Sequence, residues 1–177
     1  NWLVPHFEKM LYDNVQFILL LSKFAKINGN KYYKDKIIQT ISYLRKNFKI
    51  DKLSLLGSAY DADSEGEEGK YYTFFYEEIK DIENIDKFFD VKPEGNWEGK
   101  IILKEKNYPT REIIERLYNI RKKRIKPFFD NKTQLDLNSL WVSALVKADK
   151  ILPKKKYLKL ATDFFCNIEK NFTKNSL

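Results

Sequence analysis

Apolar residues recur at helical spacing along the first fifty residues of the chain. One side of the first predicted helix carries Phe7, Leu11, Ile18, Leu21 and Ala25, and a second side carries Met10, Phe17, Leu20 and Phe24. So broad an apolar surface predicts a helix that is covered on more than one side. The sequence Asn28-Gly29-Asn30 predicts its end, because these residue types readily take the left-handed conformation. A second helix is predicted from Lys31 to Phe48, so that the two form an α-hairpin.

The same periodicity returns in the second half of the chain. A short helix is predicted from Glu77 to Phe89, and Thr110 is expected to cap a helix that runs to about Lys126. Asp136 or Asn138 is expected to cap the next, whose inward face is Trp141, Ala144, Ala148 and Ile151. The last helix repeats the pattern with Tyr157, Ala161, Phe164 and Ile168. Helix pairs joined by long loops predict a mainly α fold, a helical array or toroid.

No repeat of fixed period and no low-complexity linker divides the chain, so we expect residues 1–177 to form a single segment. The chain opens without a Met or a helix cap, which suggests a fragment of a longer polypeptide. A partial ring of hairpins would leave apolar surface exposed at its edges.

One stretch, Asp61 to Lys70, breaks the helical pattern. It holds five acidic residues, although the net charge of the chain is +8, and these charges would repel one another unless water, a cation or a polar ligand met them. Gly66 and Gly69 allow turns, and the aromatic run Tyr71 to Tyr76 predicts a strand. The segment 59–76 is therefore predicted to be a small β-rich insertion whose loop can carry function.

Composition removes several classes of function. The basic runs Arg121 to Arg124 and Lys154 to Lys156 lie in or beside amphipathic helices and are not interleaved with aromatic residues, so we expect no nucleic-acid partner. The apolar run Phe17 to Leu21 is too short for a membrane span, and acidic residues precede it, unlike in a signal peptide. Cys166 is the only cysteine, which excludes an internal disulfide and favours a cytoplasmic location.

His6 is the only histidine, so any role for imidazole as a general acid or base falls on it. The alternative is that His6 caps a helix or bonds a neighbouring loop. The acidic stretch matches the start of an EF-hand loop, but Tyr72 stands where that loop needs a bidentate Glu. An irregular cation site stays an alternative for this loop, and we assign no metal or cofactor from the sequence. Asp61, Asp63 and Glu98 could also be the paired carboxylates of a glycosidase, a mechanism that depends on their separation.

Several stretches together resemble the spermatogenesis-associated, thioredoxin-domain-containing family. They are Trp2 to Asn14, Asp61 to Gly66, Gly69-Lys70 with Tyr72, Gly95-Asn96 with Gly99, and Asp130 to Lys132 followed by Asn138. The resemblance departs from the family pattern at Phe74, Asn131, Leu137 and Ser139. It implies the central part of an α/α toroid similar to six-hairpin glycosidases and N-acylglucosamine 2-epimerases, with a thioredoxin-like domain elsewhere in the polypeptide.

The resemblance also implies a sugar-like ligand. His6, Asp61 and Asp63 are then the expected catalytic residues, and the expected substrate-binding residues are Glu8, Tyr12, Asp13, Asn14, Glu65, Trp97 and Glu98. We expect His6, Asp13 and these loop carboxylates to face one cavity. The implied function is binding, isomerisation or epimerisation of a carbohydrate. The alternative is a scaffold or partner-binding domain that supports the thioredoxin-like domain.

Overall fold

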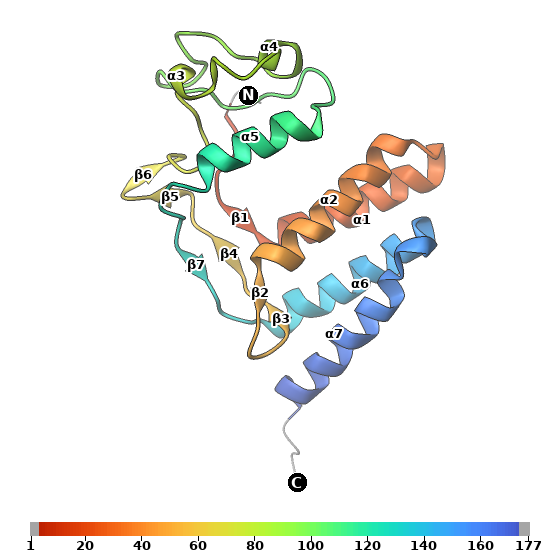
Figure 1. The fold of residues 1–177 in the computed structure, drawn as a ribbon. Coiled ribbons are helices and arrows are strands. Elements are labelled where there is room, and N and C mark those ends of the chain that lie inside the picture. Colours follow the sequence, from red (N-terminus) through yellow and green to blue (C-terminus); the bar gives the residue numbers. More distant parts are fainter. Residues whose placement is uncertain (1–3, 174–177) are drawn as a thin grey trace. The chain divides into compact units, whose positions relative to one another are not determined.

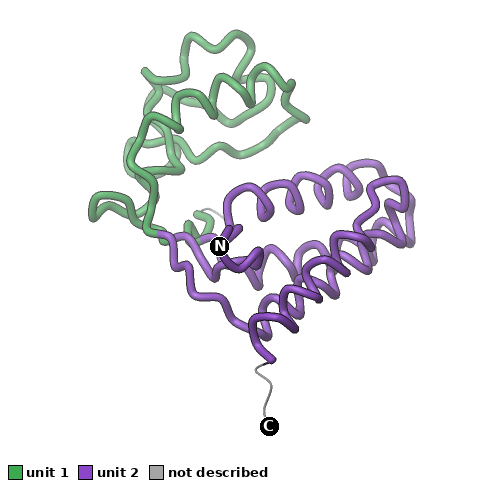
Figure 2. The backbone as a smooth tube through the Cα atoms, turned by 60° about the horizontal axis from the view of Figure 1, so that its bottom comes forward, with its two compact units in different colours: residues 1–8, 61–128 green, residues 9–60, 129–177 purple. Residues whose placement is uncertain are grey.

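The computed structural model describes residues 4–173, which form two compact units (Figure 2). Unit 1 contains residues 4–8 and 61–128, and unit 2 contains residues 9–60 and 129–173. Trp2 and Leu3, which belong to the first motif read from the sequence, lie outside the described residues. The organisation of the chain as one segment stays a prediction, since two compact units can be parts of one domain.

Unit 2 contains two helical hairpins, of which the first is α1 (Leu11–Asn28) followed by α2 (Lys31–Asn47) (Figure 1). Gly29 ends α1 with φ 65°, a conformation that glycine adopts without the steric cost of a Cβ. Asn30 caps α2, because its side-chain oxygen accepts a hydrogen bond from the backbone N–H of Tyr32 at 2.8 Å. These signals are local, and both predicted boundaries are confirmed.

The second hairpin is α6 (Leu135–Ile151), a 3-10 turn η1 (Pro153–Lys155) and α7 (Tyr157–Phe172). Pro153 lacks a backbone N–H and so cannot continue α6, which ends two residues before it, as predicted. The first helix of each hairpin packs against the other, α1 against α6, and each also packs against its own partner, α2 or α7.

The predicted cap of α6 at Asp136 or Asn138 is wrong. Gln134 is the N-cap residue, and no side chain caps the helix. Asn138 is fully buried, and its side chain is used by β3: Oδ1 accepts from the N–H of Leu56 at 2.9 Å, and Nδ2 donates to the Leu56 carbonyl at 3.0 Å. A buried amide needs such partners, so this side chain is committed to joining α6 to the β3 strand.

Between the helices lies one continuous apolar core. Its members include the positions that the helical pattern assigns to the inside, among them Ile18, Ile37, Ile41, Leu44, Trp141, Ala144 and Ala148. Burying an aliphatic or aromatic side chain stabilises the fold by about 1.5–3 kcal/mol. The predicted inward faces of these helices are therefore confirmed, with one exception: Phe7, which the helical pattern assigns to the first helix, precedes α1 and lies in unit 1.

Two helices also carry apolar stripes that face solvent. On α1 the stripe is Phe17, Leu20, Phe24 and Ile27, which are 45–81% exposed. On α7 it is Leu158, Phe165 and Phe172, with a spacing of seven residues. The prediction that α1 is covered on its second apolar side is therefore wrong, because Phe17, Leu20 and Phe24 are exposed. Exposed apolar surface is present on both helices.

Short strands connect these helices. A three-stranded antiparallel sheet has β4 (Ala59–Tyr60) between β1 (Lys9–Met10) and β7 (Phe129–Asp130). The first residue of β4 is opposite the last residue of each neighbour. A separate antiparallel pair joins β2 (Lys49–Ile50) to β3 (Leu55–Leu56). These strands fix the loops that follow α2 and precede α1 and α6.

Unit 1 holds the acidic stretch and a smaller core. Its elements are the hairpin β5 (Asp63–Ser64) and β6 (Glu67–Glu68), the helical turns α3 (Tyr76–Ile79) and α4 (Ile85–Phe88), and α5 (Arg111–Arg121). Their shared core consists of Phe74, Ile79, Ile82, Ile85, Phe89, Ile101, Ile113 and Leu117. The described part of the chain is thus mainly α, with small β elements near residues 59–76, as predicted.

Two elements of unit 1 differ from the prediction. The helix expected over Glu77–Phe89 is two single turns, because Asn84 between them has φ 59°, which interrupts the right-handed helix. The aromatic strand expected after the acidic loop is reduced to a single bridge between Phe74 and Ile101.

The boundaries of α5 are half as predicted. Thr110 caps the helix, since its hydroxyl oxygen accepts from the N–H of Ile113 at 3.4 Å. The helix ends at Arg121, however, five residues before the expected end at Lys126. Beyond the end of the helix, the side chain of Arg124 donates hydrogen bonds to the backbone carbonyls of Lys70, Tyr71 and Thr73.

Candidate functional site

His6 and Glu8 lie side by side in the segment that precedes β1. In extended backbone, alternate side chains point the same way, and His6 Nε2 lies 2.8 Å from Glu8 Oε2. Phe7, between them, points inward and is only 2% exposed. His6 is exposed and does not cap α1, which begins at Leu11 without a side-chain cap. The segment therefore presents an imidazole–carboxylate pair on an anchored backbone.

The anchor of this segment is a cluster of three aromatic rings. Phe7 is stacked on Tyr72, with ring centroids 6.1 Å apart and planes 9° apart. It also meets Trp97 at 5.1 Å with an interplanar angle of 44°. Gly69 lies beneath them with φ 70°, and a Cβ there would be 2.9 Å from the Phe7 ring and 3.1 Å from the Trp97 ring. Only glycine lets the backbone come this close to both rings.

The aromatic cluster also contacts the segment that holds two predicted carboxylates of unit 1, Asp61 and Asp63. The Tyr72 hydroxyl donates to the backbone carbonyl of Asp61 at 3.1 Å, and Asp61 Oδ1 accepts from the N–H of Asp63 at 3.3 Å. Both carboxylates are exposed. On the other side of the cluster, Trp97 is followed by Glu98, which occupies a tight turn with φ 49°. We use the name aromatic–acidic face for the surface of unit 1 formed by the aromatic cluster, the His6–Glu8 pair and the carboxylates Asp61, Asp63 and Glu98.

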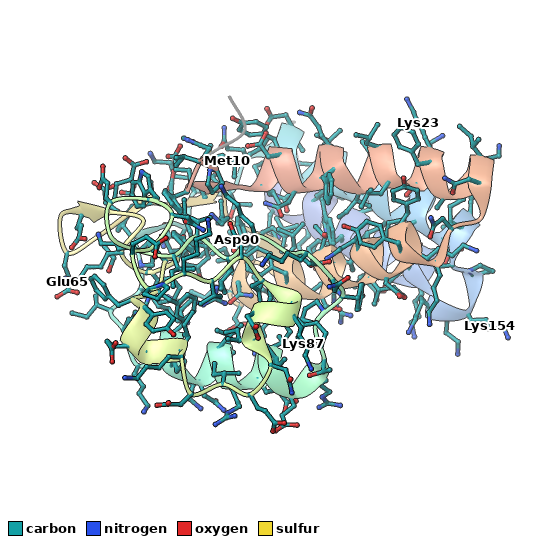
Figure 3. The ribbon with its side chains drawn as sticks, turned by 90° about the horizontal axis from the view of Figure 1, so that it is seen from above. Met10, Lys23, Glu65, Lys87, Asp90 and Lys154 are labelled. Carbon is teal, nitrogen blue, oxygen red and sulfur yellow. The ribbon has the colours of Figure 1, made fainter. Side chains whose placement is uncertain are left out.

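The acidic hairpin meets its own counter-charges. Glu65 and Gly66 form its turn with φ 55° and 75°, the pattern of a type I′ turn, and Glu65 projects from the tip (Figure 3). Lys70 Nζ lies 3.0 Å from Glu65 Oε2, and Lys100 Nζ is hydrogen-bonded to Glu67 Oε1. That hydrogen bond, helped by the positive charges of Lys100 and Lys70, lowers the pKa of Glu67 below 4.5 against the opposing effect of burial. Lysines of the chain itself thus relieve the repulsion noted in the sequence.

A cavity of about 370 Å³ lies beside the hairpin in unit 1. Its lining includes Ser64, Glu65, Glu67, Lys70, Tyr71, Thr73, Phe75, Glu78, Lys100, Lys123, Arg124 and Ile125. Of the residues predicted for the site, Glu65 is the one in this lining. Many of its lining residues are charged, but several of these charged groups are engaged with one another.

Arg124 is the most heavily engaged of these groups. One terminal nitrogen donates to the backbone carbonyls of Lys70 and Tyr71 at 3.0 and 3.3 Å. The other lies 2.8 Å from both carboxylate oxygens of Glu78. The guanidinium also lies 4.8 Å from the centroid of the Phe74 ring. Arg124 therefore holds the end of the acidic segment in place, as a structural clamp.

The remaining predicted residues belong to unit 2. Tyr12, Asp13 and Asn14 lie in the first turn of α1, and Asn14 Nδ2 donates to the Met10 carbonyl at 2.7 Å. Asp13 is exposed near a helix N-terminus, where a negative charge is favourable. Their membership of one site with His6 stays a prediction.

The described residues also bear on two further questions, whether the chain has a metal site and whether it has a membrane-spanning helix. Between residues 4 and 173 no three His, Cys, Asp or Glu side chains are grouped in a way that could hold a metal ion. Over the same range, no helix combines the length and the apolar character needed to cross a bilayer.

Comparison with known proteins identifies relatives along nearly the whole chain. Human spermatogenesis-associated protein 20 is 25% identical over 213 residues, which cover 92% of this chain and 27% of the human protein. The mouse protein of that name is 26% identical over 212 residues, covering 92% and 26%. An uncharacterised Caenorhabditis elegans protein is 27% identical over 206 residues, covering 89% and 28%. This chain is homologous to spermatogenesis-associated protein 20. The homology confirms the resemblance read from the motifs, although no family model matches the chain.

The chain spans just over a quarter of the length of spermatogenesis-associated protein 20. The fold of this chain is similar to that of a solved structure, a family 76 glycoside hydrolase from a bovine Bacteroides thetaiotaomicron strain. The two structures align with a TM-score of 0.55 at 11% sequence identity. The alignment covers 96% of this chain and 24% of the hydrolase. At this identity the likeness concerns the fold alone, and it confirms the predicted partial α/α toroid.

Several residues in the motifs that carry the family resemblance have structural roles. Asn96 accepts from the N–H of Ile102 at 2.9 Å and donates to its carbonyl at 3.0 Å. A Cβ on Gly95, which has φ 75°, would lie 2.5 Å from the Lys100 carbonyl. Gly69 and Asn138 are likewise used in internal contacts. The exposed members of the motifs, His6 among them, are the ones left for chemistry.

Sequence reasoning missed the residues that line the cavity beside the hairpin. Arg124 stands at the end of a basic run with the pattern of a solvated helix face, yet its side chain is 19% exposed and turned toward the backbone. Lys100 stands two residues after Glu98 with no motif of its own. The signal that could have found them is charge balance, because an acidic hairpin needs cations nearby.

Proposed function

We propose that the aromatic–acidic face binds a carbohydrate-like ligand. The supporting observation is the cluster of Phe7, Tyr72 and Trp97 in unit 1. Next to these rings in the sequence stand the His6–Glu8 pair and Glu98, and Tyr72 is bonded to the backbone of Asp61. Carboxylate oxygens accept hydrogen bonds from sugar hydroxyls, and the apolar faces of sugar rings pack on aromatic rings. Trp97 is half-buried, so part of its surface stays available for a ligand.

His6 is the proposed acid–base residue of this face. An imidazole that donates Nε2–H to Glu8 keeps Nδ1 as the nitrogen that can accept a proton. Removal of a proton from a carbon beside a carbonyl, followed by its return, would isomerise or epimerise a sugar. Asp61 and Asp63 would orient the hydroxyls. Glu65 at the hairpin tip would complete the part of the substrate-binding set that lies in unit 1, and a role for Tyr12, Asp13 and Asn14 of α1 stays a prediction.

The test is a titration of the chain with a panel of neutral monosaccharides and disaccharides, followed by amide and indole NMR shifts. We expect saturable shifts at the Trp97 indole and around Asp61. Trp97→Leu should weaken binding about tenfold or more, since stacking and burial each contribute on the order of 1 kcal/mol. Asp86→Asn, an exposed carboxylate on α4, is the matched control and should leave binding unchanged. Absence of saturable binding by every sugar would refute the proposal.

Catalysis needs a separate measurement on a longer homologous protein that contains this region. Turnover of any sugar that binds should fall at least a hundredfold with the equivalent of His6→Gln, which retains hydrogen bonding but cannot act as a base near neutral pH. Turnover unaffected by that change would remove His6 from the mechanism and leave only the binding role.

A non-catalytic scaffold is the second candidate, favoured by the internal use of so many motif residues. Under this alternative the region supports a partner or the thioredoxin-like domain implied by the resemblance. Variants of His6 or Asp61 would then lower thermal stability or partner binding, and the wild type would show no sugar-dependent shift.

A further inference from the structure

A second cavity, of about 400 Å³, lies in unit 2 between α2 and α7. Its walls follow from helical spacing: Ser42, Arg45 and Lys46 lie on one face of α2, at i, i+3 and i+4. On α7 the lining residues Leu160, Asp163, Phe164 and Asn167 follow the same rule. Lys49 and Ser54, from β2 and the turn before β3, complete the lining. Two helices and a strand pair thus build one pocket.

The cavity has an excess of positive charge. Three cationic side chains and one carboxylate, that of Asp163, are in its lining. Lys49 Nζ is paired with Asp51 Oδ1 at 2.9 Å, a pair exposed to solvent and therefore weak. The side chain of Arg45 makes no hydrogen bond or ion pair with another residue in the range 4–173. This guanidinium can therefore accept a ligand without first leaving a partner.

The cavity beside the acidic hairpin provides an internal comparison. There, Arg124 is held by Glu78 and by backbone carbonyls, and Lys100 by Glu67. A ligand in that cavity would have to displace protein partners that are already well placed. In the α2–α7 cavity the positive charge of Arg45 acts on Tyr157: burial raises the pKa of Tyr157, and Arg45 partly opposes that rise.

We propose that the α2–α7 cavity binds the phosphate group of a small, hydroxyl-bearing phosphate monoester. The planar guanidinium of Arg45 can donate two parallel hydrogen bonds to phosphate oxygens, and Lys49 adds charge. The hydroxyls of Ser42 and Ser54 are further donors. The volume falls in the range of small-molecule sites, about 300–1,000 Å³.

The other lining groups favour an ester over the free ion. Leu160 and Phe164 supply an apolar wall for a carbon skeleton. Asp163 would repel a second anion, but its carboxylate can accept hydrogen bonds from hydroxyl groups of the ligand. A purely inorganic phosphate would use only the cationic half of the cavity. This site is independent of the carbohydrate proposal, because none of the residues that line the α2–α7 cavity belongs to the proposed carbohydrate-binding set.

The probes are inorganic phosphate, glycerol 3-phosphate and glycerol, titrated into the chain at constant ionic strength and followed by amide NMR shifts. We expect glycerol 3-phosphate to shift Ser54 and Asn167, and glycerol to shift neither. Tighter binding of the ester than of phosphate supports recognition of the monoester. Equal affinity supports the phosphate site and shows that the apolar wall adds nothing.

Variants test whether the α2–α7 cavity itself is where glycerol 3-phosphate binds. Arg45→Gln should weaken binding of glycerol 3-phosphate about tenfold or more, because a charged hydrogen bond is lost. Lys49→Gln should weaken it less, since that side chain is paired and exposed. Lys23→Gln removes the same charge from α1 (Figure 3), outside the cavity lining, and should have little effect. Unchanged binding in Arg45→Gln, or an equal loss in Lys23→Gln, would overturn the proposal.

Discussion

Replacing Gly69 by Ala tests whether the aromatic cluster is rigid. Two costs follow from the structure. The backbone at Gly69 has φ 70°, and a residue with a Cβ in this region costs about 1–2 kcal/mol. The new methyl would also lie 2.9 Å from the Phe7 ring and 3.1 Å from the Trp97 ring, and overpacking of this kind costs about 1–3 kcal/mol more. We therefore expect Gly69→Ala to lower the free energy of unfolding of unit 1 by about 2–5 kcal/mol.

Gly66→Ala is the matched control, because Gly66 has φ 75° and no atom lies within 4 Å of the position that its Cβ would occupy. It carries the backbone cost alone, about 1–2 kcal/mol. The effect of Ala on the unfolded chain is the same in both variants and cancels in the comparison. Urea unfolding, followed by amide NMR signals of unit 1, measures each loss. Equal losses in the two variants would show that the rings move aside freely, which would refute a rigid cluster.

Two further predictions concern charge and burial. Because the pKa of Glu67 is lowered, the stabilisation from this carboxylate is fully present above pH 4.5, its ordinary pKa, and is lost as the pH falls through the lowered pKa. A carboxyl NMR titration should therefore give a midpoint below 4.5. Lys100→Gln should raise that midpoint. Asn138→Ala should lower the free energy of unfolding of unit 2 by about 1–3 kcal/mol for each backbone group of β3 left without a partner. Asn131→Ala, an exposed amide, should change it by less than about 0.5 kcal/mol in the same urea assay.

The hairpins of unit 2 could be predicted because their signals are local. Gly29 and Asn30 determine where one helix ends and the next begins through bonds within four residues of themselves. Apolar spacing then selects the inward faces, since any residue outside the stripe would meet solvent. Neither inference needs knowledge of distant parts of the chain.

The errors arise where a distant contact determines the local structure. Asn138 has the side chain of a helix cap, but it is bonded to Leu56, 82 positions away. The helix α5 ends three residues before Arg124, whose side chain bonds carbonyls more than fifty positions earlier in the chain. Asn84 interrupts a predicted helix through a left-handed conformation that its neighbours do not signal. Propensity is a weak guide in such places, because tertiary contacts override it.

For the candidate site, the sequence could identify residues but not what engages them. The basic run Arg121 to Arg124 is the most conspicuous cationic feature of the sequence, yet its last member is committed to protein carbonyls and to Glu78. Arg45 belongs to an ordinary amphipathic helix and to no motif. It nevertheless lines a cavity, and its side chain has no ion pair among the described residues. Local density of charge therefore does not distinguish a ligand site from a structural clamp. The distinction depends on whether the chain already supplies the partner, and that is fixed by contacts between segments far apart in the sequence.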